Sequence, residues 1–253
     1  MKYLPGKFVW FEHVSADPAR AAAFYGALCG WTGQSMLLGP DSYDMIMLAG
    51  KAIGGYRKAG AGMPSHWASY LSVPDVDKSL ASASQAGART LMPATDLGAV
   101  GRAAAIHDPT GAMLFLWKGA RDDAADVARI PVGGWFWNEL HSTDAKAAVV
   151  FYEKLIGYQV DTMDMGSAGA YYILKDDAGK MRAGILQQEA GVPMPSHWLP
   201  YIQVADCDAA AQHATGLGAL KTVVPPTDIP DVGRFAVLVD PLGALIAVIT
   251  GAD

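Results

Sequence analysis

The feature that most limits what this chain can fold into is an internal repeat. The pentapeptide Met-Pro-Ser-His-Trp occurs at residues 63–67 and again, unchanged, at residues 194–198. Other motifs recur in the same order: Asp17 with Phe24-Tyr25 as Asp144 with Phe151-Tyr152, Thr95-Asp96 with Val100-Gly101-Arg102 as Thr227-Asp228 with Val232-Gly233-Arg234, and Asp108-Pro109-x-Gly111 as Asp240-Pro241-x-Gly243. Because several motifs share one order, the chain is predicted to consist of two copies of one structural unit.

Each copy contains a weaker repeat of its own. Residues 8–14 are rich in aromatic and β-branched residues, which favour a strand. Asp17 can cap a following helix, Pro18 suits its first turn, and Gly30 can end it. Three strands are expected next, near 31–37, 43–49 and 52–57, and the scheme restarts with a strand at 68–73, a helix from Asp75 or Asp77 to Gly87, and strands near 89–93, 103–107 and 112–117. The predicted fold is therefore α+β, with four βαβββ modules in the chain.

Composition predicts where the two copies separate. With 253 residues, of which 51% are hydrophobic, the chain is long enough to bury two cores. Residues 118–126 are charged, alanine-rich and poor in large apolar side chains, as expected of a linker. We therefore expect domains at 1–120 and 132–253, joined by a linker at 121–131. In the second copy, a polar stretch near 175–180 predicts a longer hairpin loop.

Charge and hydropathy exclude several classes of partner. The formal net charge is −6 and the chain has no block of basic residues, which argues against binding to nucleic acid or to an anionic membrane. No apolar run approaches the roughly 18 residues that span a bilayer, and the first residues lack a signal-peptide pattern. The two cysteines, Cys29 and Cys207, are expected to be small core residues rather than a disulfide. A cytoplasmic location is predicted.

The ordered motifs resemble the vicinal oxygen chelate superfamily of glyoxalases, bleomycin-resistance proteins and extradiol dioxygenases. They are, in the first copy, Ser15-Ala16-Asp17, Phe24-Tyr25, Gly30-Trp31 and Asp108-Pro109-Thr110-Gly111, and in the second, Ser142-Thr143-Asp144, Phe151-Tyr152, Gly157-Tyr158 and Asp240-Pro241-Leu242-Gly243. Together they cover nearly the whole chain and look like the tandem glyoxalase-like subgroup. The resemblance implies that two modules pair their sheets into an eight-stranded cup, so that the chain forms two cup-shaped half-barrel domains.

The resemblance also implies where a divalent metal would be bound. Its ligands are expected on the first, fifth and last strands of each copy, where this chain has Trp10, Ala68 and Phe115, then Trp137, Leu199 and Ala247. All six are apolar or indole side chains, and an indole nitrogen is only a donor. No metal or other cofactor is therefore expected. The alternative is Zn, Ni, Mn or Fe held by substitute ligands, of which Glu139 and His141 are the most plausible pair.

Two carboxylates at matched positions are the candidate catalytic residues. Strand side chains alternate between faces, so Trp10, Glu12 and Val14 share the inner face of the first cup, and Trp137, Glu139 and His141 share that of the second. A buried carboxylate is costly unless it is paired or hydrogen-bonded. Glu12 and Glu139 could each be a structural carboxylate held by a backbone donor or an arginine, a general base or ligand acceptor, or a metal ligand.

Other side chains recur at positions that suit ligand binding. His66 and His197 are each either a loop histidine bonded to backbone, next to a core tryptophan, or a residue at the mouth of the cup that contacts ligand. Tyr70 and Tyr201 are expected on the inner face, where a phenol can donate or accept in a mostly apolar pocket. Arg102 and Arg234 are expected either to pair with Asp96 and Asp228 or to bind an anionic group. His13 is expected to face a helix.

The predicted function follows from this inner face. Its aromatic side chains suit a planar, partly polar organic molecule: Trp10, Tyr70, Phe115 and Trp117 in the first cup, and Trp137 and Tyr201 in the second. The first hypothesis is a metal-free small-molecule-binding protein, as the resemblance to antibiotic-resistance members implies. The second is a metal-dependent lyase, dioxygenase or hydroxylase with substitute ligands, and the third is a scaffold in which one cup is only structural. The chain is expected to be a monomer or homodimer.

Overall fold

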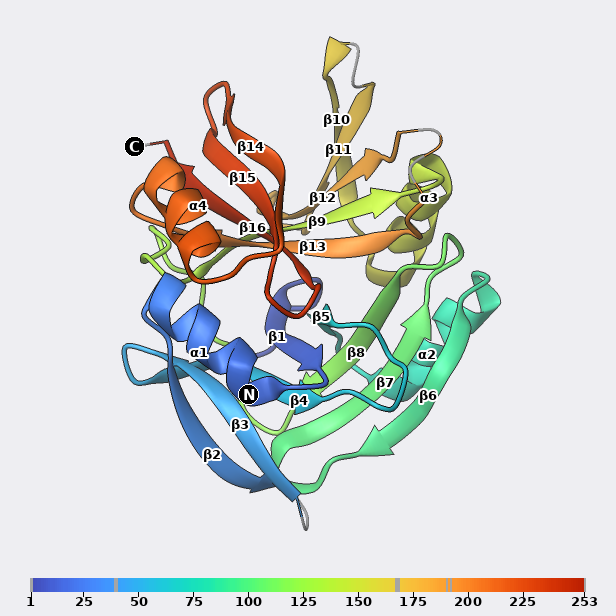
Figure 1. Cartoon of the computed structure of the whole chain (residues 1–253). Coiled ribbons are helices and arrows are strands. Elements are labelled where there is room, and N and C mark those ends of the chain that lie inside the picture. Colours follow the sequence, from blue (N-terminus) through green and yellow to red (C-terminus); the bar gives the residue numbers. More distant parts are fainter. Residues whose placement is uncertain (1, 39–40, 167–168, 190, 192, 253) are drawn as a thin grey trace. The chain divides into compact units, whose positions relative to one another are not determined.

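The computed structural model describes residues 2–38, 41–166, 169–189, 191 and 193–252 (Figure 1). The first copy contains β1 (Phe8–Ser15), α1 (Pro18–Cys29), β2 (Thr32–Leu38), β3 (Asp41–Leu48), β4 (Lys51–Lys58), β5 (His66–Ser72), α2 (Val76–Gln85), β6 (Arg89–Asp96), β7 (Gly101–His107) and β8 (Met113–Gly119). The second contains β9 (Trp135–Ser142), α3 (Ala145–Ile156), β10 (Gln159–Asp164), β11 (Ala170–Lys175), β12 (Met181–Gln187), β13 (His197–Gln203), α4 (Cys207–Gly216), β14 (Lys221–Ile229), β15 (Gly233–Val239) and β16 (Leu245–Gly251). A short 3-10 turn (Gly98–Val100) precedes β7.

Within the described residues, the strands form two mixed sheets of eight. Their orders are β2-β3-β4-β1-β5-β8-β7-β6 and β10-β11-β12-β9-β13-β16-β15-β14. In each module the first and last strands are parallel, as in β1 with β4, and the last three strands form an antiparallel meander. The prediction of an α+β fold built from βαβββ modules is confirmed.

The helix boundaries also follow the predicted signals. Asp17 accepts a hydrogen bond from the backbone N–H of Arg20, which satisfies one of the free donors at the start of α1. Gly30 ends that helix with φ of 71°, a left-handed conformation that glycine adopts without the steric cost of a Cβ. Of the two candidates for the start of α2, Asp75 is the cap, because its side chain accepts from Lys78 N–H. The predicted longer loop of the second copy is confirmed between β11 and β12.

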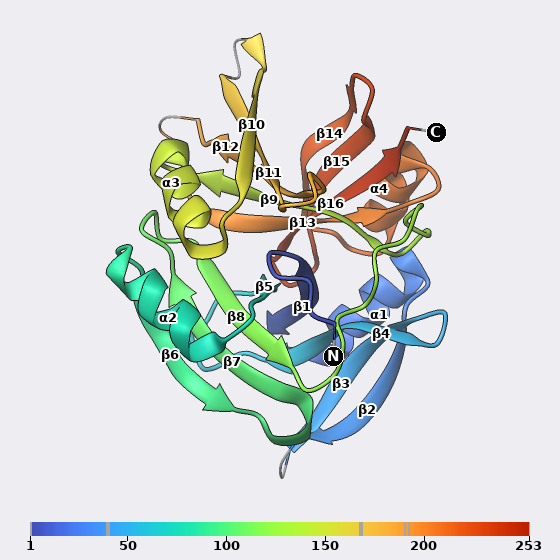
Figure 2. The ribbon, with the colours of Figure 1, turned by 180° about the vertical axis from the view of Figure 1, so that it is seen from behind.

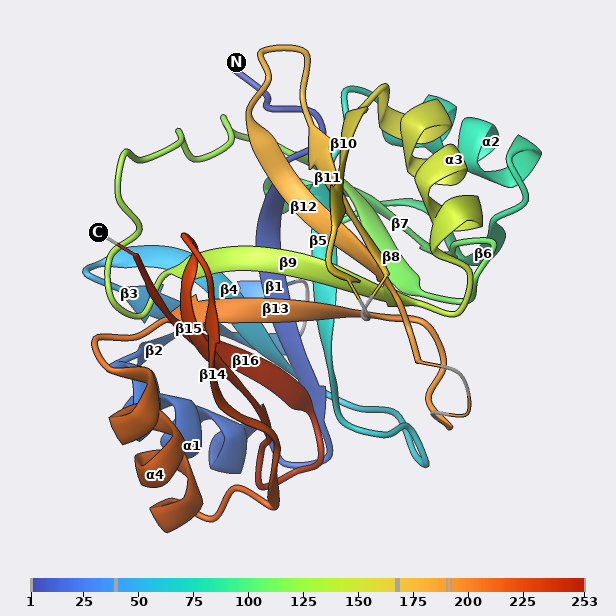
Figure 3. The ribbon, with the colours of Figure 1, turned by 90° about the horizontal axis from the view of Figure 1, so that it is seen from above.

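Packing groups the residues differently from the sheets. One compact unit comprises residues 1–9, 69–125 and 137–198, and the other comprises 10–68, 126–136 and 199–253. Each unit thus takes one module from each copy. In the first unit α2 packs against α3, and in the second α1 packs against α4, as Figures 2 and 3 show. The division into sequential domains at 1–120 and 132–253 stays a prediction.

The predicted linker has no helix or strand and contacts the start of the chain. The backbone N–H of Lys2 donates to Asp122, and that of Leu4 donates to Asp123. Asp123 also accepts a hydrogen bond of 2.6 Å from the Ser72 hydroxyl. These bonds hold residues 121–125 against the first compact unit. None of the helices in the described ranges is long and apolar enough to cross a membrane.

Each compact unit has a buried aspartate at its centre, taken from an Asp-Pro-x-Gly motif. In the first unit, Asp108 accepts from the Tyr152 hydroxyl at 3.0 Å, and Trp198 Nε1 donates to the same hydroxyl. In the second unit, Asp240 accepts from the Tyr25 hydroxyl, and Trp67 Nε1 donates to that hydroxyl. The repeated motifs therefore form one buried hydrogen-bonded core arrangement twice.

The two cysteines are free and buried, as expected of small core residues. Burial raises the pKa of Cys29 to about 12, and burial with nearby aspartates raises that of Cys207 to about 11. Both thiols therefore stay protonated near neutral pH and are poor nucleophiles.

Candidate functional site

The strand β1 separates a helix-facing side from an opposite side. His13 is fully buried, and its ring lies against Tyr25 of α1 at a centroid distance of 5.6 Å. This confirms that His13 faces a helix. Because side chains alternate along a strand, Trp10, Glu12 and Val14 point to the opposite, helix-free side.

In the first copy, Glu12 is the centre of a hydrogen-bonded cluster. Its side chain is 1% exposed, and Arg57 Nε donates to its Oε2 at 2.7 Å. The Tyr43 hydroxyl donates to Oε1 at 2.8 Å, and Trp10 Nε1 donates to that hydroxyl at 3.0 Å. Arg57 Nη2 adds a second bond to Oε1. These are the contacts expected of a structural carboxylate held by an arginine; a catalytic role for Glu12 stays a prediction.

In the second copy, Glu139 has the same tryptophan and tyrosine partners. The Tyr171 hydroxyl donates to Glu139 Oε2 at 2.7 Å, and Trp137 Nε1 donates to that hydroxyl at 2.9 Å. Burial, reinforced by the Glu139 charge, raises the pKa of Tyr171, so the phenol stays a donor. The basic neighbour is different: His141 Nε2 lies 3.0 Å from Glu139 Oε1 but outside hydrogen-bond geometry.

The two basic side chains, Arg57 and His141, come from different strands. Arg57 lies on β4, opposite Val14 of β1 in the strand register. In the second copy the matched pair is Leu186 of β12 and His141 of β9. The basic side chain therefore lies on the fourth strand of the module in the first copy and on the first strand in the second copy, whereas the carboxylate has the same position in both. An apolar residue occupies the partner position in each copy.

Tyr43, Tyr171 and Arg57 belong to these clusters but were missed by the sequence reasoning. The two tyrosines could have been suspected from a glycine in the neighbouring strand, Gly55 for Tyr43 and Gly184 for Tyr171. A Cβ on Gly55 would lie 2.0 Å from the Tyr43 hydroxyl, and one on Gly184 would lie 1.8 Å from the Tyr171 hydroxyl. A glycine inside a strand often marks such a close approach.

The two repeated histidines are tethered to the backbone in the same way. His66 Nδ1 lies 2.9 Å from the carbonyl oxygen of Pro64, and His197 Nδ1 lies 3.0 Å from that of Pro195. Each is followed by a tryptophan that is buried in the core, as the structural interpretation predicts. His197 differs in one respect, because its ring stacks on His141 at a centroid distance of 5.1 Å. Burial lowers the pKa of His197.

The remaining candidate aromatics make ring contacts with one another. In the first unit, Tyr70 is 4% exposed and stacks on Phe115 with a centroid distance of 4.4 Å and an interplanar angle of 10°. Trp117 meets the same tyrosine edge-on. In the second unit, Tyr201 lies 6.0 Å from Phe235 in a tilted arrangement. The expected inner-face aromatics thus make small aromatic clusters within each unit.

The chemistry of the available side chains does not fit a metal centre of the expected kind. Trp10 and Trp137 donate to tyrosines, Phe115 is stacked on Tyr70, and the other three expected ligand positions carry alanine or leucine. Among the described residues, no group of three or more His, Cys, Asp or Glu is arranged to hold a metal ion.

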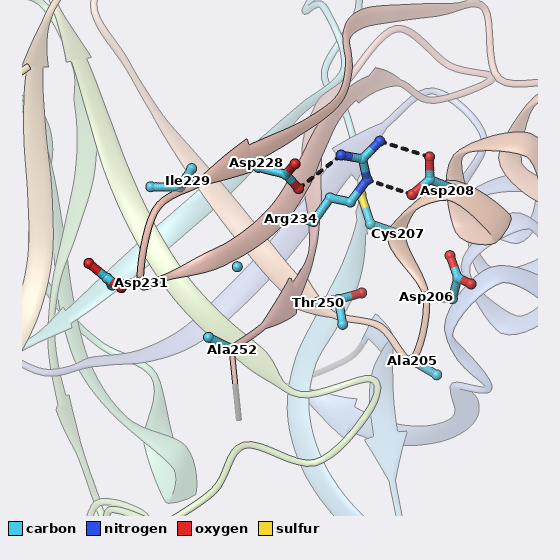
Figure 4. A pocket seen from close by; sticks show the side chains of 11 residues that line it. Ala205, Asp206, Cys207, Asp208, Asp228, Ile229, Asp231, Arg234, Thr250 and Ala252 are labelled. Carbon is cyan, nitrogen blue, oxygen red and sulfur yellow. Dashed lines mark hydrogen bonds and ion pairs between the residues drawn. The ribbon is translucent and has the colours of Figure 1, made fainter.

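The two repeated arginines are engaged by aspartates. Arg102 pairs with Asp77 of α2 at 2.8 Å rather than with the expected Asp96, because Asp96 accepts from the Gly98 backbone instead. Arg234 does bond to the expected Asp228, at 2.9 Å, and also to Asp208. Figure 4 shows this arginine between its two aspartates, at the edge of a surface hollow of about 540 Å³. Both arginines therefore form ion pairs with aspartates of the protein, as the structural alternative predicts.

Comparison with known proteins places this chain among relatives of the same length. It is 35% identical over 257 residues to the protein named "Putative glyoxylase CFP32" of Mycobacterium tuberculosis, covering 99% of this chain and 97% of the relative. It is 31% identical over 267 residues to the anthracycline biosynthesis protein DauV of a Streptomyces species, covering 98% and 94%. No family model matches the chain.

Solved structures share the fold at lower identity. The Mn(II)-bound glyoxalase from Novosphingobium aromaticivorans matches with a TM-score of 0.67 and 18% identity, over 97% of this chain and 82% of that one. The 2,2',3-trihydroxybiphenyl 1,2-dioxygenase from Sphingomonas wittichii matches with a TM-score of 0.65 and 14% identity, over 97% and 90%. Sequence relatives, duplicated βαβββ modules and shared fold agree: the chain belongs to the vicinal oxygen chelate superfamily, as a tandem glyoxalase-like protein related to the extradiol dioxygenases.

Proposed function

We propose that this protein binds a planar, partly polar organic molecule on the helix-free side of its strands, without a resident metal. The proposal depends on the residue at one position, the place on the first strand of each copy where the family has a metal ligand. In both copies a tryptophan occupies it, and this tryptophan is hydrogen-bonded through a tyrosine to a buried glutamate. A tryptophan, a tyrosine and a glutamate linked by hydrogen bonds offer an aromatic surface for stacking and polar groups in fixed positions. This is the usual composition of a small-molecule site.

The relatives support a polycyclic aromatic ligand. DauV is named as an anthracycline biosynthesis protein, and an anthracycline contains a flat, hydroxylated ring system. Partly exposed aromatic surface suited to such rings is provided by Trp10 with Tyr43 and by Trp137 with Tyr171. Stacking of two aromatic rings contributes about 0.5–1.5 kcal/mol beyond the area it buries.

The test is equilibrium binding of a planar hydroxyanthraquinone, measured by calorimetry and by quenching of tryptophan fluorescence. Trp137→Leu is expected to weaken binding about ten-fold, because it removes a stacking surface and the donor to Tyr171. The matched control is Val132→Leu, an exposed position before β9. The titration is repeated after exhaustive chelation and after adding Mn, Fe, Ni or Zn. Binding that disappears with chelation and returns with one metal would overturn the proposal.

One observation favours a second candidate, metal-assisted lyase or dioxygenase chemistry with substitute ligands. Glu139 Oε1 and His141 Nε2, the pair of substitute ligands expected from the sequence, are 3.0 Å apart. Stoichiometric metal that is retained by the native protein and lost in Glu139→Gln would select this candidate. Turnover of a dicarbonyl or a catechol only with that metal would then identify its reaction.

A further inference from the structure

The protonation pattern of His197 is determined by its backbone contact. Nδ1 lies 3.0 Å from the Pro195 carbonyl oxygen, which can only accept, so Nδ1 carries the proton of the neutral ring. The opposite nitrogen, Nε2, is then an unprotonated acceptor. It makes no hydrogen bond to another residue in the described part of the chain, and the side chain is partly exposed.

Its neighbours keep this ring in place and keep it neutral. The His141 ring stacks on it with an interplanar angle of 20°, and His141 in turn lies against Glu139. Burial lowers the pKa of His197, and the nearby His141 lowers it further. The Pro195 hydrogen bond and the Glu139 charge oppose these effects without reversing them. An uncharged imidazole with one bare nitrogen therefore remains near neutral pH.

We propose that His197 Nε2 accepts a hydrogen bond from a neutral hydroxyl of the bound ring system, and that His141 is the positioning residue that holds the imidazole. This inference rests on the proposed function and names the ligand class for the site of the second copy. The recognised group is a single phenolic or enolic O–H. A methyl ether of the same ring lacks the donor and loses the bond.

The first copy supports the assignment by contrast. His66 has the same tether to a proline carbonyl, but Val14 replaces the stacked histidine on the neighbouring strand position. The charged group beside Glu12 is Arg57, which is a donor and cannot accept. The acceptor imidazole that is also held by a stacked histidine therefore belongs to the second copy.

The experiment compares 2-naphthol with 2-methoxynaphthalene by isothermal titration calorimetry. The native protein is expected to prefer the naphthol about five-fold, the size of one neutral hydrogen bond. His197→Asn keeps an amide donor for the Pro195 carbonyl but lacks Nε2, and is expected to abolish the preference. Its affinity for the ether should stay within two-fold. His197→Phe, which keeps the stacked ring without either nitrogen, is expected to behave in the same way.

A control and a positional test complete the design. His213→Phe, on an exposed face of α4, should retain the full preference. The double variant His141→Val with Leu186→Arg copies the Val14–Arg57 pair of the first copy, and should lower the preference by loosening the His197 ring.

The outcomes separate the inference from the function on which it rests. A preference unchanged in both His197 variants overturns the inference and leaves the proposed function standing, since a steric preference would survive both substitutions. A native protein that binds both compounds equally has the same meaning. If it binds neither compound, the proposed function fails and the inference fails with it.

Discussion

The two copies keep their buried carboxylates at the same positions but satisfy them with different partners. Glu12 is held by Arg57, whereas Glu139 lies against His141 from another strand. Asp240 lies 2.7 Å from His13 Nε2, whereas the matching Asp108 accepts from the Thr110 hydroxyl.

This difference shows that each buried carboxylate position is kept, whereas the residue that interacts with the carboxylate can change. A buried carboxylate needs donors for its oxygens, and any neighbouring position that can supply one will serve. His13 has its counterpart in Leu140, and Thr110 has its counterpart in Leu242, so each compact unit has one polar partner and one leucine. Exchanging these partners tests that requirement directly.

The largest effect is expected from His13→Leu, which gives the first copy the residue of the second. Asp240 is fully buried and would lose its 2.7 Å partner, so the free energy of unfolding should fall by about 3 kcal/mol. Urea unfolding measures the change. Adding Leu242→Thr should recover about 1 kcal/mol, because Thr110 bonds to Asp108 in this way. A loss below about 1 kcal/mol for His13→Leu would show that the pair contributes little.

Arg57→Leu should have the next largest effect. It leaves Glu12, 1% exposed, with the Tyr43 hydroxyl, and should cost about 2 kcal/mol, less than a fully buried pair because Arg57 is 48% exposed. Thermal and urea unfolding provide the measurement. Val14→His in the same chain recreates the arrangement of the second copy and should restore part of the loss. If the double variant is less stable than Arg57→Leu alone, the two partner positions are not interchangeable.

Gly55→Ala and Gly184→Ala should each cost about 1–3 kcal/mol, because the new methyl group meets a tyrosine hydroxyl. The tyrosine must then move and release its bond to Glu12 or Glu139. Unfolding experiments should show a smaller penalty when Tyr43→Leu or Tyr171→Leu is already present, since the hydroxyl and the ring carbon Cζ, 2.4 Å from the new methyl group, are then absent. Equal penalties in both backgrounds would mean that the close approach is not the cause.

The smallest effect is expected in acid and concerns Asp240. Burial alone would raise its pKa, but His13 and the backbone N–H groups of Ala244 and Leu242 outweigh burial and lower it. A lowered pKa stabilises the fold above the unfolded value of about 3.9 and this contribution is lost as pH falls through the folded value. Stability measured from pH 6 to pH 2 should therefore drop on the acid side. His13→Leu should flatten that drop, and an unchanged slope would contradict the assignment.

The order and ends of the elements could be predicted well from the sequence because their causes are local. Asp17 caps a helix whose first N–H groups are three residues away, and Gly30 ends it through its own φ. Because the motifs repeat, the βαβββ module predicted for the first residues could be assigned to all four modules. The outer ends of β6 and β7 were less well predicted, since pairing across the hairpin, not propensity, extends them to Asp96 and Gly101.

The candidate site was predicted less completely. Alternation along a strand correctly grouped Trp10 with Glu12, and Glu139 with His141. It could not identify Tyr43 or Arg57, because these side chains arrive from other strands and their pairing depends on register.

What local sequence settled here is the duplicated α+β architecture and the helix caps, both of which depend on residue type and spacing alone. What three-dimensional packing settled is the partner of each buried carboxylate. His13 and Asp240 are separated by 227 residues, and Glu12 and Arg57 by 45. Burial makes such a partner necessary, but any donor that packing brings within about 3 Å can fill the role, so its identity emerges only when the strands are in register.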